Sequence, residues 1–358
     1  MHLKFDAIYS EASRPENSLP YSPERDRFVL FSDHHKGAGS KADDFKKNAV
    51  LYNEALGYYE ERNFRAILLG DNEELWETRI DRVLERYGDI ISREIRLSPS
   101  NASGKKIRLW GNHDKEVVLK SFDRFLRRTG ENPFKEVDYL EGLCLGPDIF
   151  LIHGHQGRFF EDQAWRISRW AIKFIWKTIQ KLFRIGRDGP AENIRIRESL
   201  EMGYYSWAKR RKVILICGHT HRAMFGSLSH YERLQSEVLA MQKIGSKKLT
   251  GNLRLRLERM EKELQRILEK NRGRPPKSMR SGKGDPVPCY FNDGCCGYTN
   301  GITCIELDRG WIRLVKWNRK NSVREVLAEG RIQDILESVK RGRVKKNLPR
   351  HKPPPFPA

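Results

Sequence analysis

Five apolar runs in this chain each end in a turn that carries aspartate, asparagine or histidine. The runs are RFVLFSDHH (27–35), RAILLGDNE (65–73), KIRLWGNHD (106–114), DIFLIHGH (148–155) and KVILICGHTH (212–221). Their nearly continuous apolar stretches predict strands buried on both faces of a sheet. One polar turn after a strand can be accidental, but five in succession indicate a shared site.

Two of the gaps between these runs have the pattern of amphipathic helices. KADDFKKNAVLYNEALGYYEERN (41–63) follows the first run, and TRIDRVLERYGDIISREIRL (78–97) follows the second. Alternating strands and helices predict an α/β architecture built from βαβ units. In such sheets ligands bind beyond the carboxyl ends of the strands, which is where the polar turns lie.

The polar turn residues have the chemistry of a metal site. Imidazole, carboxylate and amide donors together suit Mn²⁺, Fe or Zn²⁺, whereas an oxygen-only set favours Ca²⁺ or Mg²⁺. Seven potential ligands are too many for one tetrahedral ion and suffice for two ions if one carboxylate bridges. The ligand candidates are Asp33, His35, Asp71, Asn112, His153, His219 and His221.

Two ions about 3.5–4 Å apart can clamp a phosphoryl group, and a further histidine near the leaving oxygen can act as a general acid. Any single histidine is more often structural than metal-ligating. However, seven of the ten histidines of the chain fall in these turns, which makes that interpretation poor for the group. We therefore expect a metal centre rather than isolated structural histidines.

The five turns, taken in order, resemble the motifs of the calcineurin-like metallophosphoesterases. The motifs are D-x-H, G-D, G-N-H-D, H-G-H and G-H-T-H, spread over residues 33–221. The resemblance implies a four-layer α/β/β/α sandwich with helical insertions. It also implies a metal-dependent phosphoric ester hydrolase with two divalent ions, Mn²⁺ foremost and Fe or Zn²⁺ as alternatives.

The resemblance also implies a role for each matching residue. One ion would be held by Asp33, His35, Asp71 and His221. The other would be held by Asp71, Asn112, His153 and His219, so that Asp71 bridges the two. His113, oriented by Asp114, would contact the phosphate and assist departure of the leaving group.

The stretch GDNEELWE (70–77) resembles the G-D-x-x-D-x-W stretch of bacterial UDP-2,3-diacylglucosamine pyrophosphatase-like enzymes, with Glu74 in place of aspartate and Trp76 retained. Those enzymes usually have arginine at the position of His113 and H-G-D in place of H-G-H. The resemblance implies a lipid-linked or nucleotide-sugar substrate, while monoester, diester and pyrophosphate all stay open.

We expect one metallophosphoesterase domain over residues 1–320, with two insertions. The first, 158–210, contains QAWRISRWAIKFIWKTIQKLFR (163–184), whose basic and apolar stripes fit either a lid helix or an interfacial helix on an anionic membrane. The second, 229–284, is helical and then basic. A strand and helix extension (321–340) and a basic, proline-rich, disordered tail (341–358) follow.

The net charge of +21 favours phosphorylated anionic substrates, an anionic membrane surface or nucleic acid as partners. A nucleic-acid phosphodiesterase is thus one alternative function, although no RNP or helix-turn-helix pattern is present. A non-catalytic protein-binding scaffold of the same fold is another. A P-loop NTPase is excluded because G-x-x-x-x-G-K-[ST] is absent.

No run of about 18 apolar residues and no apolar signal core is present, and the six cysteines form no C-x-x-C pair. We therefore expect a cytoplasmic protein with reduced, mostly buried thiols, which include Cys295 and Cys296, and with peripheral membrane contact through 163–184 as an alternative. His34 should point away from the ions. His155 could contact substrate or support a ligand. Lys36 and Lys41 are expected to be solvated surface charges.

Overall fold

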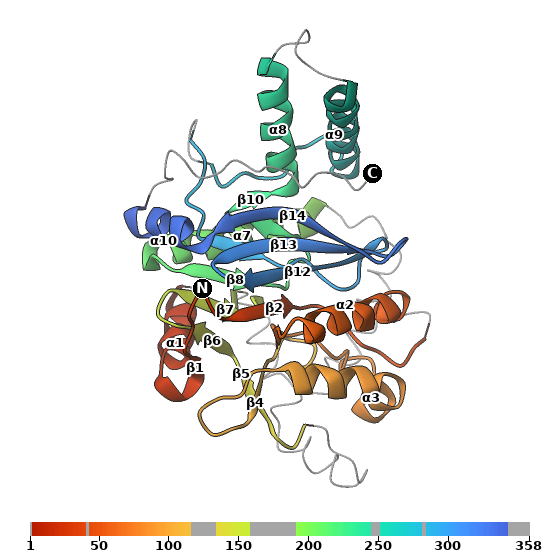
Figure 1. Cartoon of the computed structure of the whole chain (residues 1–358), viewed down its shortest axis with the longest axis vertical. Helices are drawn as coiled ribbons and strands as arrows, with labels where there is room; N and C mark the ends of the chain where they lie inside the picture. The colour runs from red at the N-terminus through yellow and green to blue at the C-terminus, as the bar shows by residue number, and fades with distance from the viewer. Residues whose placement is uncertain are drawn as a thin grey trace.

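The computed structural model describes residues 2–40, 43–115, 134–157, 191–244, 251–280 and 284–342 (Figure 1). The predicted lid or interfacial helix at 163–184 lies outside these residues, as do Lys41 and nearly all of the predicted tail. Within the described ranges, no helix is both long and apolar enough to cross a membrane. All six cysteines are buried and unpaired.

Two sheets form the centre of the molecule. The first has seven strands, in the order β1 (Ser18–Leu19), β6 (Gly142–Leu145), β7 (Ile149–Ile152), β8 (Ile214–Cys217), β11 (Tyr290–Asn292), β9 (Met224–Phe225) and β10 (Leu228–Ser229). The second has five strands, in the order β14 (Val323–Arg331), β13 (Trp311–Asn318), β12 (Gly301–Asp308), β2 (Arg27–Phe31) and β3 (Arg65–Leu68). A parallel pair, β4 (Lys106–Leu109) and β5 (Val137–Leu140), lies next to β3.

Helices cover the outer faces of both sheets. α1 (His2–Ala12) and α7 (Ala191–Arg211) contact strands of the seven-stranded sheet, and α2 (Ala49–Glu61) and α3 (Ile80–Leu97) contact the five-stranded sheet. α10 (Ile332–Arg341) follows β14. The described part of the chain also contains three short 3-10 helices: η1 (Pro15–Asn17), η2 (Phe45–Lys47) and η4 (His155–Gly157).

The alternation of side chains along β2 explains the layering. Phe28 and Leu30 point into the core between the sheets, whereas Val29 and Phe31 point to the opposite face and join the core beneath α2 and α3. All four side chains are fully buried. The prediction of a four-layer α/β sandwich is confirmed, and a strand buried on both faces is the reason that the run reads as continuously apolar.

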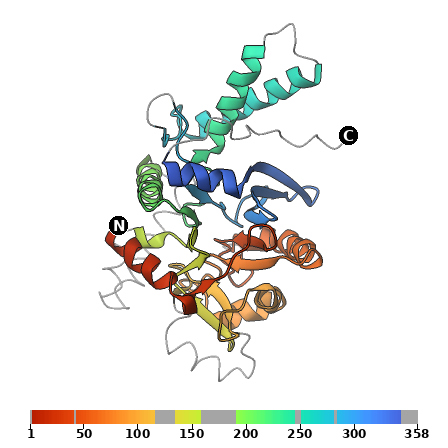
Figure 2. The ribbon, with the colours of Figure 1, turned by 60° about the vertical axis from the view of Figure 1, so that its left-hand side comes forward.

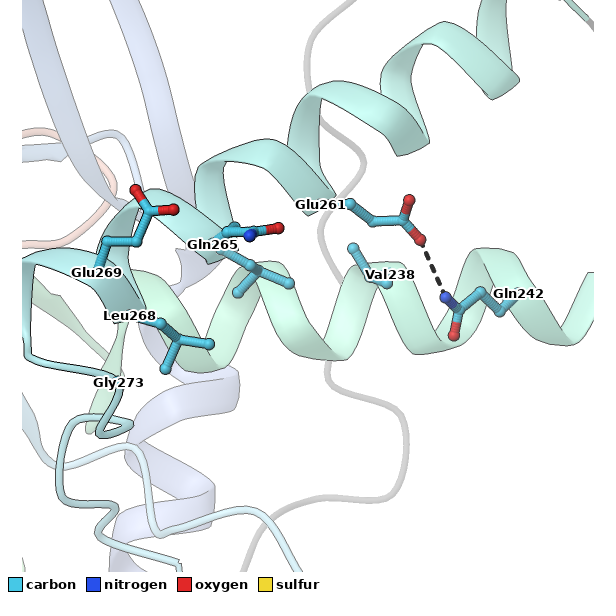
Figure 3. Close-up of a pocket in the computed structure, with 8 residues that line it drawn as sticks. Val238, Gln242, Glu261, Gln265, Leu268, Glu269 and Gly273 are labelled. Carbon is cyan, nitrogen blue, oxygen red and sulfur yellow. Dashed lines mark hydrogen bonds between the residues drawn. The ribbon is translucent and has the colours of Figure 1, made fainter.

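A helical hairpin projects from this body beyond β10 (Figures 1 and 2). It consists of α8 (His230–Ile244) and α9 (Gly251–Lys270), which pack against each other. α8 begins with a capping box, because the Glu232 carboxylate accepts hydrogen bonds from the Ser229 backbone N–H and hydroxyl, each at 2.8 Å. Between the helices lies a groove with Val238, Leu268 and Gln265 on its walls (Figure 3).

The residues predicted as the extension, 321–340, form β14 and most of α10. β14 pairs antiparallel with β13 along its whole length, so this segment completes the five-stranded sheet. Ile332, Ile335 and Val339 of α10 are buried in the core between the sheets. The end of the described chain is thus tied to the sandwich, while the hairpin inserted at β10 stands apart from it (Figure 2).

Candidate metal centre

The carboxyl ends of five strands carry the polar turns, and the side chains of these turns lie close together. The turns follow β2, β3, β4, β7 and β8, as the sequence pattern predicts. Among the residues that the structure describes, three groups of acidic and histidine side chains each have ligand atoms within 4.8 Å of one another. The first is Asp33, His35 and His221; the second is Asp71, His153 and His219; the third is His35, Glu74 and His113.

The first group is organised around the buried carboxylate of Asp33. Its Oδ1 lies 2.9 Å from His221 Nε2 and 3.8 Å from His35 Nε2. Its Oδ2 accepts a hydrogen bond of 2.8 Å from the backbone N–H of His219, which belongs to the second group. One carboxylate therefore ties the turn after β2 to the turn after β8.

The second group is organised around Asp71, whose side chain faces both of its neighbouring groups. Asp71 Oδ2 lies 3.2 Å from His153 Nε2 and 3.8 Å from His35 Nε2. Its other oxygen, Oδ1, accepts a hydrogen bond of 2.8 Å from the backbone N–H of His113. A single carboxylate oxygen thus lies between histidines of the first and second groups, as a bridging ligand requires.

Glu74 holds two histidines by the same oxygen. Glu74 Oε2 lies 2.7 Å from His113 Nδ1 and 3.1 Å from His35 Nδ1, so each ring is fixed through Nδ1 and has Nε2 left over. The His113 ring also stacks on Trp76, with ring centroids 3.9 Å apart. These contacts give His113 a defined orientation at the edge of the centre.

Asp114 does not orient His113, contrary to what the motif resemblance implied. Its buried carboxylate accepts hydrogen bonds from the backbone N–H groups of Asn72 and Gly111 and from the Asn72 side chain. The physical reason is that both oxygens of the carboxylate accept hydrogen bonds that join the turn after β3 to the turn after β4. Asp114 therefore supports the loop of Asp71, and Glu74 takes the orienting role.

Several ligand atoms lack any hydrogen-bond partner among the described residues. Asn112 Oδ1, His35 Nε2 and the ring nitrogens of His153 are buried in this way. A buried polar atom without a partner is costly, whereas a bound cation would use these lone pairs. The donor set of imidazole, carboxylate and amide oxygen therefore fits a divalent transition metal.

The backbone at the proposed ligands is strained. Five of them have a positive φ, between 50° and 66°, which non-glycine residues seldom adopt: Asp33, His35, Asp71, His219 and His221. Such conformations cost on the order of 1–3 kcal/mol each and persist where the surrounding structure enforces them. A side chain at Gly218 would overlap the side chains of Ser32 and Asp33, so glycine lets the backbone after β8 pack directly against these two side chains.

The charges of the site shift the pKa of neighbouring ligand candidates in opposite directions. Burial alone would raise the pKa of Asp71, but His153 and His113 outweigh it and hold that pKa well below its usual range. Burial opposes charge on His153, yet Asp71 raises its pKa to about 9. Burial and the neighbouring His153 lower the pKa of His219 to about 3. The carboxylate of Asp71 and the imidazole of His153 thus favour each other's charged form.

The two remaining histidines of the motifs lie outside the ligand groups. His34 is fully buried among aromatic rings, with its centroid 4.6 Å from Tyr52 and 5.7 Å from Phe45, so it points away from the ligands as predicted. His155 is buried between Trp110 and His153, at 5.1 and 5.5 Å. Burial lowers the pKa of both rings well below the usual range.

Two residues near the centre escaped the sequence interpretation. The Ser32 hydroxyl hydrogen-bonds to both Asp33 and Asp293, the latter at 2.8 Å. Asp293 follows β11 directly, so the rule that polar residues gather after strands would have found it in the stretch YFNDG. Burial and the nearby Asp33 raise the pKa of Asp293 well above its usual range.

A pocket of about 490 Å³ opens over the first and third groups. His35, His113 and His221 lie in its wall, together with Glu77, Tyr298 and Cys295. The groove of the α8–α9 hairpin is similar in size, but none of the three candidate ligand groups of the described chain lies there. The pocket at the strand ends is thus the one of these two that adjoins the candidate metal ligands.

The comparisons with known proteins agree with this geometry. The sequence model of the family described as calcineurin-like phosphoesterase matches residues 26–223, a range that contains all five turns. A search of curated proteins gave no match. The match covers more than half of the chain and stops just after His221, before the helical hairpin and the last strands.

Proposed function

The chain belongs to the calcineurin-like phosphoesterase family, and from this premise we propose that its strand-end residues hold two divalent metal ions and hydrolyse a phosphoester bond. Asp33, His35 and His221 would hold one ion. Asn112, His153 and His219 would hold the other, with Asp71 shared between them. Mn²⁺ is the proposed metal, ahead of Fe and Zn²⁺.

One observation carries the proposal of a dinuclear centre. Asp71 Oδ2 lies between His35 and His153, at 3.8 and 3.2 Å, so a single oxygen faces the ligands proposed for both ions. Two divalent ions bound there would polarise the phosphoryl group and lower the pKa of an attacking water. The strained turns support the same proposal, because the backbone holds these side chains in place before any ion binds.

The other residues of the site orient the substrate and move a proton. Glu74 accepts a hydrogen bond from His113 Nδ1, which leaves Nε2 of that ring for the substrate in the pocket wall. We assign His113 the protonation of the leaving oxygen. Asp114 holds the turn of Asp71 against the turn of His113, because its carboxylate accepts hydrogen bonds from the backbone N–H groups of Asn72 and Gly111.

For the substrate we propose a phosphorylated lipid or nucleotide sugar, as in UDP-2,3-diacylglucosamine pyrophosphatase-like enzymes. The stretch G-D-x-x-E-x-W supports this proposal, because Glu74 and Trp76 stand at the positions of the acidic residue and the tryptophan in that group's G-D-x-x-D-x-W stretch. Contact with an anionic membrane through residues 163–184 would bring a lipid-linked substrate to the pocket. One alternative is a nucleic-acid phosphodiesterase, which the net charge of +21 favours. The other is a non-catalytic scaffold.

A substrate panel with added Mn²⁺ tests the proposal. Aryl monoester, aryl diester, nucleotide-sugar, lipid-linked and oligonucleotide phosphates are offered to the wild-type chain and to His219→Ala. We expect turnover of at least one class by the wild type and a loss of about 10³-fold or more in the variant. A wild-type chain that turns over no substrate with Mn²⁺, Fe²⁺ or Zn²⁺ would instead support the scaffold.

A further inference from the structure

Four charged side chains lie fully buried directly behind the metal centre. Lys36 follows β2, Glu73 follows β3, Arg108 lies on β4 and Glu94 lies on α3, and each has 0 % exposure. The sequence interpretation placed Lys36 on the surface, and this prediction is wrong. We call these four residues the buried ion cluster. With two cations and two anions, it is neutral as a whole.

The members of the cluster contact one another in a closed set. Lys36 Nζ lies 2.9 Å from Glu94 Oε1 and 3.7 Å from Glu73 Oε1. Arg108 Nη2 lies 2.8 Å from Glu73 Oε1 and 3.3 Å from Glu94 Oε2. Each cation therefore contacts both anions, and four separate segments of the chain are joined at one point.

The cluster is built onto the two loops that carry metal ligands. Lys36 is the residue after His35, and Glu73 lies two residues after Asp71. The backbones of these loops are hydrogen-bonded to each other: His35 N–H donates to the Asp71 carbonyl at 2.9 Å, and Lys36 N–H donates to the Asn72 carbonyl at 3.0 Å. The Lys36 ammonium also reaches the Asn72 carbonyl, at 3.4 Å.

Fold stability alone is a poor explanation for such a cluster. Removing charges from water is costly, and well-packed apolar residues often replace a buried ion pair without loss of stability. The cluster is also incompletely satisfied, because Arg108 Nε and Nη1 are buried without a hydrogen-bond partner among the described residues. What charged groups provide and apolar groups do not is a single defined geometry, because each contact is directional.

We propose that the buried ion cluster is a positioning device that holds the loop of His35 against the loop of Asp71 and thereby sets the affinity for the metal pair. The inference rests on the proposed function, since it assumes that these loops bind metal. It predicts that the cluster matters for metal binding beyond its effect on folding.

Paired substitutions separate the two effects. Lys36→Met and Glu94→Gln each leave one uncompensated buried charge, whereas the double variant is neutral again. The matched control is the double variant Arg324→Met/Glu306→Gln. It removes an ion pair of 2.6 Å whose Glu306 is also buried, between β12 and β14 and away from the ligand loops.

The readouts are the free energy of unfolding of the metal-free chain and the Mn²⁺ affinity by calorimetry. We expect the Lys36→Met/Glu94→Gln variant to recover most of the stability that each single variant loses, yet to bind Mn²⁺ at least 10-fold more weakly than wild type. The control variant should keep wild-type Mn²⁺ affinity. Glu94→Gln, which preserves the side-chain shape, carries the same expectation if the double variant does not fold.

Wild-type Mn²⁺ affinity in a folded Lys36→Met/Glu94→Gln or Glu94→Gln variant would overturn the positioning role and leave the proposed function intact. An equal loss of affinity in the control variant would also overturn it, because it would show a general effect of stability. A wild-type chain that binds no Mn²⁺, Fe²⁺ or Zn²⁺ would overturn the metal centre itself, and the positioning role with it.

Discussion

At the scale of single residues, the centre depends on side chains whose backbone would be unfavourable elsewhere. Asp33, His35, Asp71, His219 and His221 all have a positive φ. Because such turns aim successive side chains in directions that a regular strand cannot, they bring imidazole and carboxylate groups from separate strands to one point. The strain is therefore tied to the proposed function, and substitutions here should affect chemistry more than folding.

The variant His113→Ala should lose turnover but keep its metal. The His113 side chain is held by Glu74 and Trp76 and belongs to neither proposed ion site. We expect kcat to fall about 10²–10⁴-fold, as for loss of a general acid. Metal content measured on the same sample should stay at the wild-type level, and a loss of metal would mean that His113 is a ligand.

Metal binding at neutral pH should release protons. Burial opposes charge on His153, but Asp71 outweighs it and raises the His153 pKa to about 9, and Asp33 and Glu74 likewise raise the pKa of His35. We therefore expect both rings to carry a proton on each nitrogen at pH 7 in the metal-free chain, and each ring must lose one of them to become a ligand. Mn²⁺ affinity should therefore rise as the pH increases from 6 towards 9.

Calorimetry in two buffers of different ionisation enthalpy measures this release directly. The observed binding enthalpy should differ between the buffers in proportion to the protons released. The same enthalpy in both buffers would show that the histidines are already neutral, or that they are not the ligands.

At the scale of elements, the capping box of α8 offers a test of how the projecting hairpin begins. Ser229→Ala removes the hydroxyl that accepts from the Glu232 N–H and donates to the Glu232 carboxylate. We expect a loss of about 1 kcal/mol in the free energy of unfolding. Ser10→Ala, at an exposed position inside α1, is the control and should cost nothing. Equal effects of the two substitutions would argue against the cap.

The strands and the gathering of the polar turns at their ends were predictable because both depend on local pattern. A strand buried on both faces is continuously apolar, and ligands bind beyond the carboxyl ends of such strands. An apolar run followed by a polar turn, as in 65–73 and 212–221, can therefore be recognised in the sequence. Contacts between distant segments have no such signature. The role of orienting His113 was predicted for Asp114 and not for Glu74, because nothing in the sequence tells which carboxylate reaches the His113 ring.

The burial of Lys36 was missed for a related reason. A lysine beside glycines has the composition of a surface turn, and its ion-pair partners Glu73 and Glu94 are 37 and 58 residues away in the chain. Only the fold brings α3 and β4 behind the turn after β2. The projecting arrangement of the α8–α9 hairpin was hidden as well, because an apolar stripe predicts that a helix packs but not where it packs.

At the scale of the whole molecule, metal and fold should be coupled. Each ion that binds the folded chain but not the unfolded chain stabilises the fold by about 2.7 kcal/mol at a free metal concentration 100 times Kd. For two such ions and a chain of this length we expect Mn²⁺ to raise Tm by roughly 7 °C over the chelated protein. Thermal denaturation monitored by circular dichroism measures this, and an unchanged Tm would argue against tight binding at the strand ends.

The number of Mn²⁺ ions bound per chain, in the wild type and in Asp71→Ala, tests the central claim most directly. Elemental analysis after equilibrium dialysis gives this number. We predict two ions per wild-type chain and fewer than one in Asp71→Ala, because that carboxylate faces the ligands of both ions. Two ions still bound to a folded Asp71→Ala variant, or none bound to the wild type, would contradict the shared dinuclear centre.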